Sequence, residues 1–269
     1  MLKLMYITNQ PWIAEIANEA GVDRIFVDLE TIGKTERQGG MDTVQSHHTL
    51  NDVKRIRETF KGELLVRSNH IYEGSKDEID CIIENGADVV MLPYFKSVND
   101  AAKFIDIVDG RAKVNLLVET AEAVDKLDGI LELDGVDEIH IGLNDLHLAY
   151  GMNFMFELVA NGTVERLAKQ VLASGKKFGF GGIAGVGKGL IPAEMVIREH
   201  YRIGSTCAIL SRAFCNTDII TEPKSVRNIF LSGIKAIREV ENECQKHLDF
   251  FKVNQNSFIQ NVNTIIGKN

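Results

Sequence analysis

The chain has 269 residues, of which 45% are hydrophobic and 25% charged, with a formal net charge of −8. This composition is typical of a globular protein long enough to bury a large core. The acidic balance without a basic stripe argues against nucleic acid as a partner, and no apolar run approaches a membrane span. The four cysteines lack metal-type spacing, so we interpret them as reduced thiols of a cytoplasmic protein.

Short β-branched runs alternate with helical patterns along the chain. Strands are predicted at 2–7, 25–28, 63–67, 88–92, 113–118, 138–142, 178–183 and 207–210. Helices are predicted at 11–20, 51–60, 76–85, 99–108, 121–131, 164–174, 193–199 and 224–248. This alternation predicts a parallel sheet closed as a (β/α)8 TIM barrel. The alternative, an open doubly wound sheet, would have a glycine-rich turn after the first strand, where Thr8-Asn9-Gln10-Pro11 stands.

We expect one barrel domain over residues 1–248, because an α/β barrel of this length is commonly a single domain. A helical tail, 249–269, follows. Within it Phe258, Val262, Ile265 and Ile266 share one helical face. Periodicity does not say which surface such a stripe covers. The tail therefore closes its own barrel or packs on another subunit.

Charged residues stand directly after several predicted strands. Asp28 and Glu30 follow the second strand, Arg67 the third, Glu119 the fifth and Asp145 the sixth. The carboxyl ends of the strands of a parallel barrel meet at one rim, where barrel enzymes place their active sites. We therefore expect these side chains to share a pocket. A polar stretch without clear period, 31–49, leaves the same rim, and loops of this length are usually functional or mobile.

Glu119 and Asp145 form a candidate metal site. Mg²⁺ takes one or two carboxylates and keeps other positions for water or substrate oxygens. The alternative is that both are surface carboxylates that only shape loops. Arg67 favours the metal site, because a charge after an apolar strand needs an ion pair or a ligand. Its planar guanidinium suits a carboxylate or an enolate oxygen.

Four parts of the sequence resemble a known family. They are residues 27–30 (Val-Asp-Leu-Glu), 66–69 (Val-Arg-Ser-Asn), 86–93 (Gly-Ala-Asp-Val-Val-Met-Leu-Pro), and 117–120 (Leu-Val-Glu-Thr, with Ala123) together with 141–146 (Ile-Gly-Leu-Asn-Asp-Leu, with Gly151). They occur in order at predicted strand ends. On these segments the chain resembles the HpcH/HpaI aldolase/citrate lyase β-subunit family, of the pyruvate/phosphoenolpyruvate superfamily.

The resemblance implies a metal-dependent, class II carbon–carbon lyase that cleaves or forms an aldol of a 2-oxo acid and an aldehyde. It implies Mg²⁺, Mn²⁺ or another divalent cation on Glu119 and Asp145. Arg67 would hold the oxo or enolate oxygen of a pyruvate-like ligand. Backbone amides from Gly142 through Asn144 to Asp145 would bind its carboxylate. Family members tend to be trimers or hexamers, so a homo-oligomer is expected.

Two other functions remain open. Within the family, the chain resembles lyases that act on malyl- or citryl-type thioesters, but it lacks an obvious basic patch for a CoA diphosphate. Outside catalysis, it could be a small-molecule-binding barrel that kept the metal pair and lost the base. Two departures from the aldolase pattern bear on this: Thr31 stands where aldolases have a histidine, and Leu117 where they have a glutamine.

The general base is therefore sought elsewhere. His47 is preferred because its loop leaves the rim beside Glu30, and the other candidates are His48, His70 and His147. Each of these histidines can equally be a solvated or packing residue. Glu30 is expected to orient a water molecule, to hydrogen-bond Arg67, or only to pair with a cation.

A glycine-rich segment follows the seventh strand. Residues 182–189 have the Gly-x4-Gly-Lys form of a phosphate loop, but Gly189 replaces the hydroxyl residue that would bind Mg²⁺. Barrels often bind phosphate at this part of the rim, so Gly182 is a candidate substrate-binding residue. The alternative is a flexible loop that closes over the site. Arg212, after the eighth strand, would add a cation for a phosphate or sugar acid, or pair with an acidic neighbour.

Overall fold

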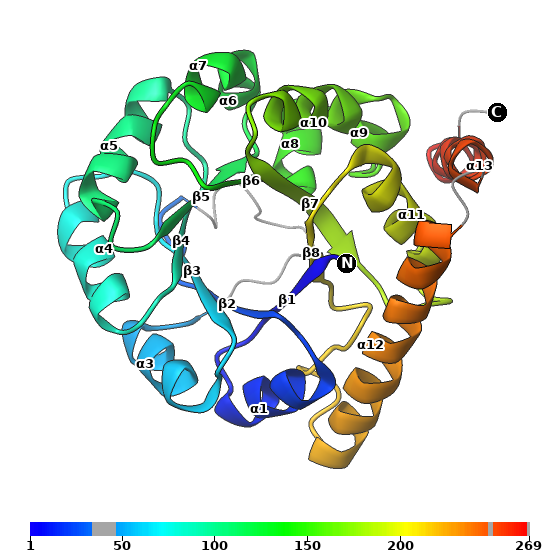
Figure 1. Ribbon diagram of the computed structural model, residues 1–269, viewed down its shortest axis with the longest axis horizontal. Coiled ribbons are helices and arrows are strands. Elements are labelled where there is room, and N and C mark those ends of the chain that lie inside the picture. The colour runs from blue at the N-terminus through cyan, green and yellow to red at the C-terminus, as the bar shows by residue number, and fades with distance from the viewer. Residues whose placement is uncertain (34–46, 247–249, 268–269) are drawn as a thin grey trace.

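A computed structural model describes residues 1–33, 47–246 and 250–267. Eight parallel strands close into a barrel in chain order, and helices surround it (Figure 1). This confirms the predicted (β/α)8 architecture. The strands are β1 (Lys3–Ile7), β2 (Arg24–Asp28), β3 (Glu63–Arg67), β4 (Val89–Leu92), β5 (Lys113–Val118), β6 (Glu138–Ile141), β7 (Lys177–Ile183) and β8 (Cys207–Leu210).

The helices agree with the predicted ones along most of the chain. They are α1 (Pro11–Ala20), α3 (Leu50–Thr59), α4 (Ser75–Glu84), α5 (Val98–Val108), α6 (Ala121–Asp125), α7 (Leu127–Leu131), α8 (Leu143–Ala149), α9 (Glu157–Ala160), α10 (Thr163–Ala173), α11 (Ala193–Ile203), α12 (Pro223–Lys246) and α13 (Phe250–Ile265). The predicted helix 121–131 is wrong as one element, because the backbone leaves helical geometry at Lys126. The end predicted for the long helix, and the predicted domain boundary after residue 248, lie outside the described residues.

Local sequence explains where helix α3 begins. Thr49 accepts a hydrogen bond from the backbone N–H of Asp52, and the Asp52 carboxylate accepts one from the backbone N–H of Thr49. This reciprocal capping box satisfies donors at the helix start that would otherwise lack partners. It fixes the start of α3, and with it the last residues of the β2–α3 connection. Residues 34–46 of that connection lie outside the described part of the chain.

The core has two layers separated by the barrel wall. Alternate strand residues point outward to the helices, where Ile25 and Val27 pack, or inward to the axis, where Phe26 packs. The buried residues of the inner cluster are Met5, Phe26, Leu65, Val89, Met91, Leu117 and Cys207. The barrel is therefore filled, and a ligand has access only at its ends.

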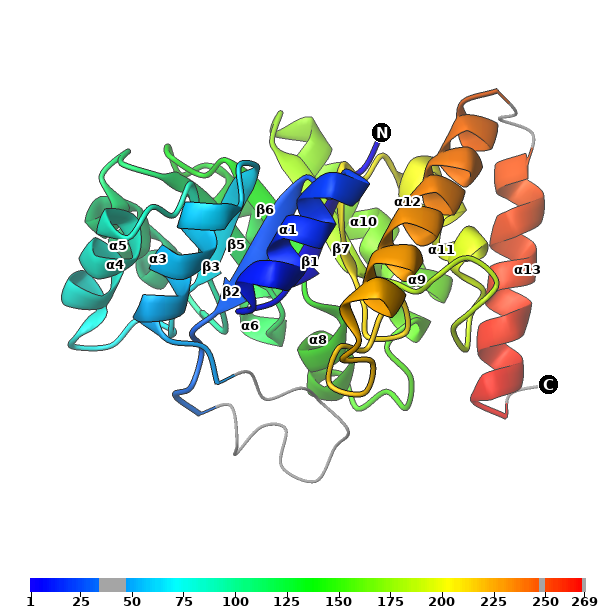
Figure 2. The same cartoon turned by 90° about the horizontal axis from the view of Figure 1, so that it is seen from below.

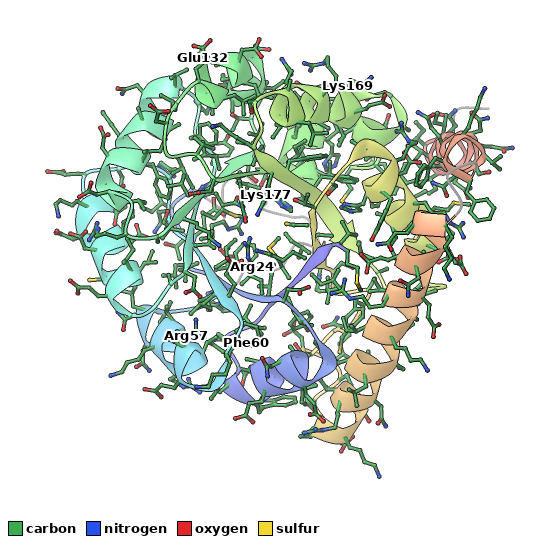
Figure 3. The ribbon with its side chains drawn as sticks, viewed as in Figure 1. Arg24, Arg57, Phe60, Glu132, Lys169 and Lys177 are labelled. Atoms are coloured by element: carbon green, nitrogen blue, oxygen red, sulfur yellow. The ribbon has the colours of Figure 1, made fainter. Side chains whose placement is uncertain are left out.

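A charged layer closes the amino-terminal end of the barrel. Arg24 is fully buried and lies near the barrel axis (Figure 3). Its Nε donates to Glu63 Oε2 at 2.9 Å, and its Nη1 and Nη2 donate to the Glu138 carboxylate at 2.8 and 2.9 Å. Burial alone would lower the pKa of Arg24, but hydrogen bonding to Glu138 and the Glu138 charge outweigh it and raise the pKa. These ion pairs assign the amino-terminal end of the barrel a role in stability.

The tail helix packs on its own chain. Helix α13 lies against α11 and α9, outside the ring of barrel helices (Figure 1). Phe258 is buried with its ring 5.8 Å from that of Phe156, and Val262 is buried beside it. Ile265 of the predicted stripe is 41% exposed. Contact with another subunit stays a prediction. None of the helices formed by the described residues has the length and apolar character needed to cross a membrane.

Candidate active site

The charged residues expected at one rim stand at or just after the carboxyl ends of their strands. Those strand ends form the lower edge of the barrel in Figure 2, where α6 and α8 also lie. Strands β2 and β3 are paired in register so that Asp28 is opposite Arg67. Arg67 Nε and Nη2 donate to the two Asp28 carboxylate oxygens at 2.8 Å each. This two-point contact fixes the plane of the guanidinium.

Glu30 contacts the remaining corner of the guanidinium. Its Oε2 is 3.4 Å from Arg67 Nη1, and the side chain is buried. Burial alone would lower the pKa of Arg67, but the charges of Asp28 and Glu30 outweigh it, and the pKa is raised above its ordinary value. Arg67 therefore stays charged at all physiological pH values. N–H groups on Nη1 and Nη2 remain for a ligand, since a guanidinium has five donors.

Glu119 is held by the end of β4. The backbone N–H of Tyr94 donates to Glu119 Oε1 at 2.9 Å. Tyr94 has a φ of 43°, in the left-handed region that a bulky residue rarely adopts. Non-glycine residues persist in such strained conformations where the surroundings determine them, often at functional sites. The turn at Tyr94 directs its N–H toward the carboxylate.

Gly142 is required on the other side of Glu119. A Cβ added at residue 142 would lie 2.7 Å from Glu119 Cβ and 2.8 Å from Glu119 Oε2. Only glycine permits this approach. Gly142 is also the N-cap of α8, and Asp145 stands in the first turn of that helix. The partial positive charge of a helix start favours a carboxylate there, and Asp145 is buried.

Negative charge exceeds positive charge at this rim. Burial, and then the charge of Asp145, raise the pKa of Glu119 well above its ordinary value, and Glu30 adds to the effect. Arg67 acts in the opposite direction. Three carboxylates, those of Asp28, Glu30 and Glu119, thus interact with one guanidinium, and a fourth, that of Asp145, acts on Glu119. A divalent cation between Glu119 and Asp145 would remove this imbalance, so the donor set fits a hard cation that takes two carboxylates.

The residues at the rim fit a metal site with two carboxylate ligands. Among residues 1–33, 47–246 and 250–267, no group of three or more His, Cys, Asp or Glu side chains is placed to hold a metal ion. A dedicated cage of protein ligands is therefore absent from the described part of the chain. Mg²⁺ commonly completes its shell with water and substrate oxygens in such open sites.

A cavity of about 830 Å³ opens beside the guanidinium. Asp28, Arg67, His47 and His48 line it. The rest of the wall comes mainly from the β1–α1 connection and the β8–α12 connection. Its polar members are Thr8, Asn9, Gln10, Arg212, Asn216, Thr217, Asp218 and Thr221.

The candidate histidines differ in their environments. His48 Nδ1 accepts a hydrogen bond from the backbone N–H of Asp28 at 3.0 Å. His47 is exposed and lines the cavity. His147 Nδ1 is 3.1 Å from the Leu143 carbonyl oxygen within α8, which is a structural contact. His70 Nδ1 is buried and has no hydrogen-bond partner within the described part of the chain.

The glycine-rich segment does not form a phosphate loop. Gly182 lies inside β7, at the irregularity where that strand pairs with β8. Further on, the backbone N–H of Gly187 donates to Glu194 Oε2 at 3.1 Å. A carboxylate that occupies a loop amide disfavours phosphate there. A substrate contact by Gly182 stays a prediction.

Several contacts of the site could not be predicted from the sequence. Asp28 was expected at the rim because its strand ends in charge, but its two-point contact with Arg67 depends on strand register. The Tyr94 N–H and the His48 contact carry no signal in the sequence, because they depend on backbone geometry and on the path of a long connection.

Comparison with known proteins identifies the family. Residues 3–199 match the family described as HpcH/HpaI aldolase/citrate lyase. A curated relative, the 2-keto-3-deoxy-L-rhamnonate aldolase of Escherichia coli K12, is 27% identical over 206 residues, which cover 64% of this chain and 71% of the relative.

Solved structures show the same fold. The HpcH/HpaI aldolase of Desulfitobacterium hafniense DCB-2 superposes with a TM-score of 0.62 at 17% identity, covering 84% of this chain and 93% of that one. An HpcH/HpaI aldolase/citrate lyase family protein of Burkholderia cenocepacia J2315 gives 0.64 at 16% identity, with 84% and 94% covered. The matched region contains every rim carboxylate and Arg67. The chain belongs to the HpcH/HpaI aldolase/citrate lyase family.

Proposed function

We propose that the protein is a divalent-metal-dependent carbon–carbon lyase that cleaves or forms the aldol of a pyruvate-like 2-oxo acid and an aldehyde. The observation that carries the proposal is the buried pair Glu119 and Asp145 beside Arg67, whose guanidinium lines a cavity. Aldol chemistry next to a ketone passes through an enolate, and positive charge fixed beside the oxygen stabilises it.

Mg²⁺ or Mn²⁺ held by Glu119 and Asp145 would supply Lewis-acid stabilisation of the developing enolate. Arg67 contributes a second, permanent positive charge. Asp28 contacts Nε and Nη2 and Glu30 contacts Nη1, and the remaining N–H groups on Nη1 and Nη2 are available to the oxo oxygen. The predicted contact by Gly142 is not supported, because its N–H donates to the Val118 carbonyl oxygen at 3.0 Å. The backbone amides of Asn144 and Asp145, at the start of α8, would bind the substrate carboxylate, since the first N–H groups of a helix lack intrahelical partners.

The aldehyde would occupy the cavity between the β1–α1 and β8–α12 connections. Asn9, Gln10, Asn216 and Thr217 give this wall hydroxyl and amide groups, which suit a hydroxylated aldehyde. The name of the E. coli relative, a 2-keto-3-deoxy sugar-acid aldolase, fits such an acceptor. Arg212 lines the same cavity and would contact the distal end of the aldehyde, as Gly182 would if the end of β7 reaches it.

The two loop histidines would have different roles. When neutral, His48 carries its proton on Nε2, because its Nδ1 accepts the Asp28 N–H. It is therefore a hydrogen-bond donor. His47 would serve as the base that takes the aldol hydroxyl proton. Glu30 would hold Arg67 and orient a water molecule. We expect the working form to be a cytoplasmic homo-oligomer, a trimer or hexamer.

Proton exchange tests the proposal directly. Purified protein with Mg²⁺ or Mn²⁺ and pyruvate in D₂O is followed by the loss of the methyl signal in ¹H NMR. Metal-dependent exchange is expected, because it reports enolate formation. Absence of exchange together with turnover of malyl-type thioesters would assign the protein to the thioester branch. Absence of both, with metal bound, would make it a binding protein.

A further inference from the structure

Two residues of the β3 exit hold the β2 exit by different means. Arg67 contacts the side chains of Asp28 and Glu30. Asn69, two residues later, contacts the backbone beyond them: its Oδ1 accepts the N–H of Thr31 at 2.8 Å and that of Ile32 at 2.9 Å. In the chain, Glu30 therefore follows Asp28, which Arg67 holds. It precedes Thr31 and Ile32, which Asn69 holds.

Asn69 is itself anchored to helix α4. Its side-chain Nδ2 and its backbone N–H both donate to Glu78 Oε1, at 3.0 Å each. The amide is thus fully oriented: its oxygen faces two donors, and its nitrogen faces a carboxylate. A continuous set of hydrogen bonds runs from α4 through Asn69 to the start of the β2–α3 connection.

We propose that Asn69 is a positioning residue for Glu30 and Arg67, with Glu78 as the group that orients it. The inference rests on the proposed function, because Arg67 is there assigned to the enolate oxygen. The backbone N–H of Glu30 also donates to Asp28 Oδ1 at 3.2 Å, so residues 28–32 form one segment held at both ends. Loosening the Asn69 end lets Glu30 withdraw from Nη1 and changes how the guanidinium faces the substrate.

Reversing the polarity of the Asn69–Glu78 pair tests this directly. Asn69→Asp keeps an oxygen for Thr31 and Ile32 but places a second carboxylate against Glu78. Asn69→Asp combined with Glu78→Gln restores a donor and an acceptor in opposite order. Glu78→Gln alone keeps an acceptor for both Asn69 N–H groups. Glu73→Gln, an exposed carboxylate in the β3–α4 connection, is the matched control in the Asn69→Asp background.

Three readouts are needed. Amide hydrogen exchange of the peptide that contains residues 29–33 reports the hydrogen bonds without any activity. The kcat and KM for deuterium exchange into pyruvate report the chemistry, and the affinity for Mn²⁺ reports the metal site. Asn69→Asp is expected to speed amide exchange at Thr31 and Ile32 and to lower kcat about tenfold, the effect of losing about one hydrogen bond in the transition state. Mn²⁺ affinity should stay within about twofold, because the metal pair is not touched.

The double variant Asn69→Asp with Glu78→Gln should recover kcat and the slow amide exchange of the wild type. Glu73→Gln in the Asn69→Asp background should recover neither. Unchanged amide exchange in Asn69→Asp would overturn the proposal. Faster amide exchange combined with wild-type kcat would also overturn it. So would a loss of kcat in Asn69→Asp that the added Glu78→Gln does not repair, or an equal loss of kcat in Glu78→Gln alone. If the wild-type protein exchanges no pyruvate protons while the amide readout behaves as expected, the proposed function fails and the catalytic consequence fails with it. The hydrogen bonds from Thr31 and Ile32 to Asn69 are then still supported by the amide exchange.

Discussion

Gly142→Ala would displace Glu119 without removing any ligand. The added Cβ would meet Glu119 Cβ at 2.7 Å, whereas ordinary contact begins at 3.4 Å, so one side must move by about 0.7 Å. The contact is with the stem of the side chain, and Leu117 Cδ1, at 3.2 Å, narrows the space further. Tyr94 holds the far oxygen, so the carboxylate cannot retreat without losing that hydrogen bond.

The expected cost follows from this displacement. Overpacking a filled site costs about 1–3 kcal/mol of stability. Misplacing a reacting group by about 1 Å costs on the order of 100-fold in rate, so a shift of this size should lower pyruvate proton exchange roughly 10- to 100-fold. Mn²⁺ affinity, measured by calorimetry, should fall by about the same factor, as it does when the groups that orient metal ligands are disturbed.

Gly129→Ala is the matched control. Gly129 lies in α7, and a Cβ there would meet only Val98 Cγ2, at 3.3 Å. Because alanine is favoured over glycine in helices by about 0.5–1 kcal/mol, this variant should be neutral or slightly more stable, with unchanged Mn²⁺ affinity. If Gly142→Ala folds and binds Mn²⁺ as tightly as Gly129→Ala does, Glu119 is not a metal ligand.

Three further predictions concern the rim and the closed end of the barrel. Asp145→Asn should abolish metal-dependent proton exchange while circular dichroism and Tm stay close to wild type; retained exchange would remove Asp145 from the metal site. Arg67→Lys loses one of two charged hydrogen bonds to Asp28, each of about 1.5–3 kcal/mol, so kcat should fall roughly 10- to 100-fold, and a change in KM alone would make Arg67 a binding residue. Arg24→Met removes the arginine partner of the buried Glu138 carboxylate, while Glu63 keeps its ion pairs with lysines; it should cost about 3–5 kcal/mol in urea unfolding, with Mn²⁺ affinity unchanged, and a neutral result would show that the charged layer does not depend on Arg24.

The same charged layer predicts an acid-dependent loss of stability. Burial alone would raise the pKa of Glu63, but the charge of Arg24 and hydrogen bonds from Lys113 and Lys3 outweigh it and lower the pKa from 4.5 to about 2. The folded pKa is below the unfolded one, so this stabilisation is complete above pH 4.5 and is lost as pH falls toward 2. Urea midpoints measured at pH 5 and pH 3 should differ more in wild type than in Arg24→Met. Equal differences would contradict the assignment.

Strand positions could be predicted because strands buried on both faces appear in the sequence as short, continuous apolar runs. Runs such as Val89-Val90-Met91 are apolar throughout, as strands of a parallel barrel must be. Helix α8 was missed because its seven residues, Leu143–Ala149, are too few to show a helical period. The break at Lys126 was missed because the apolar spacing continues through it.

The side-chain types at the rim were predictable, but their mutual geometry was not. Glu119 and Asp145 follow strands that are neighbours in the barrel, so their proximity follows from topology. The hydrogen bond from Tyr94 depends on one left-handed residue, and the close approach at Gly142 depends on the angle at which α8 leaves β6. Neither is encoded in a local pattern.

The central claim is that Glu119 and Asp145 share one divalent cation beside Arg67. Crystals grown with Mn²⁺ and pyruvate, measured at a wavelength where manganese scatters anomalously, test it most directly. One anomalous peak per chain is predicted within about 2.0–2.4 Å of an oxygen of each carboxylate, with the pyruvate oxo oxygen facing Arg67. A peak bound elsewhere, or none at a Mn²⁺ concentration that supports exchange, would contradict the account.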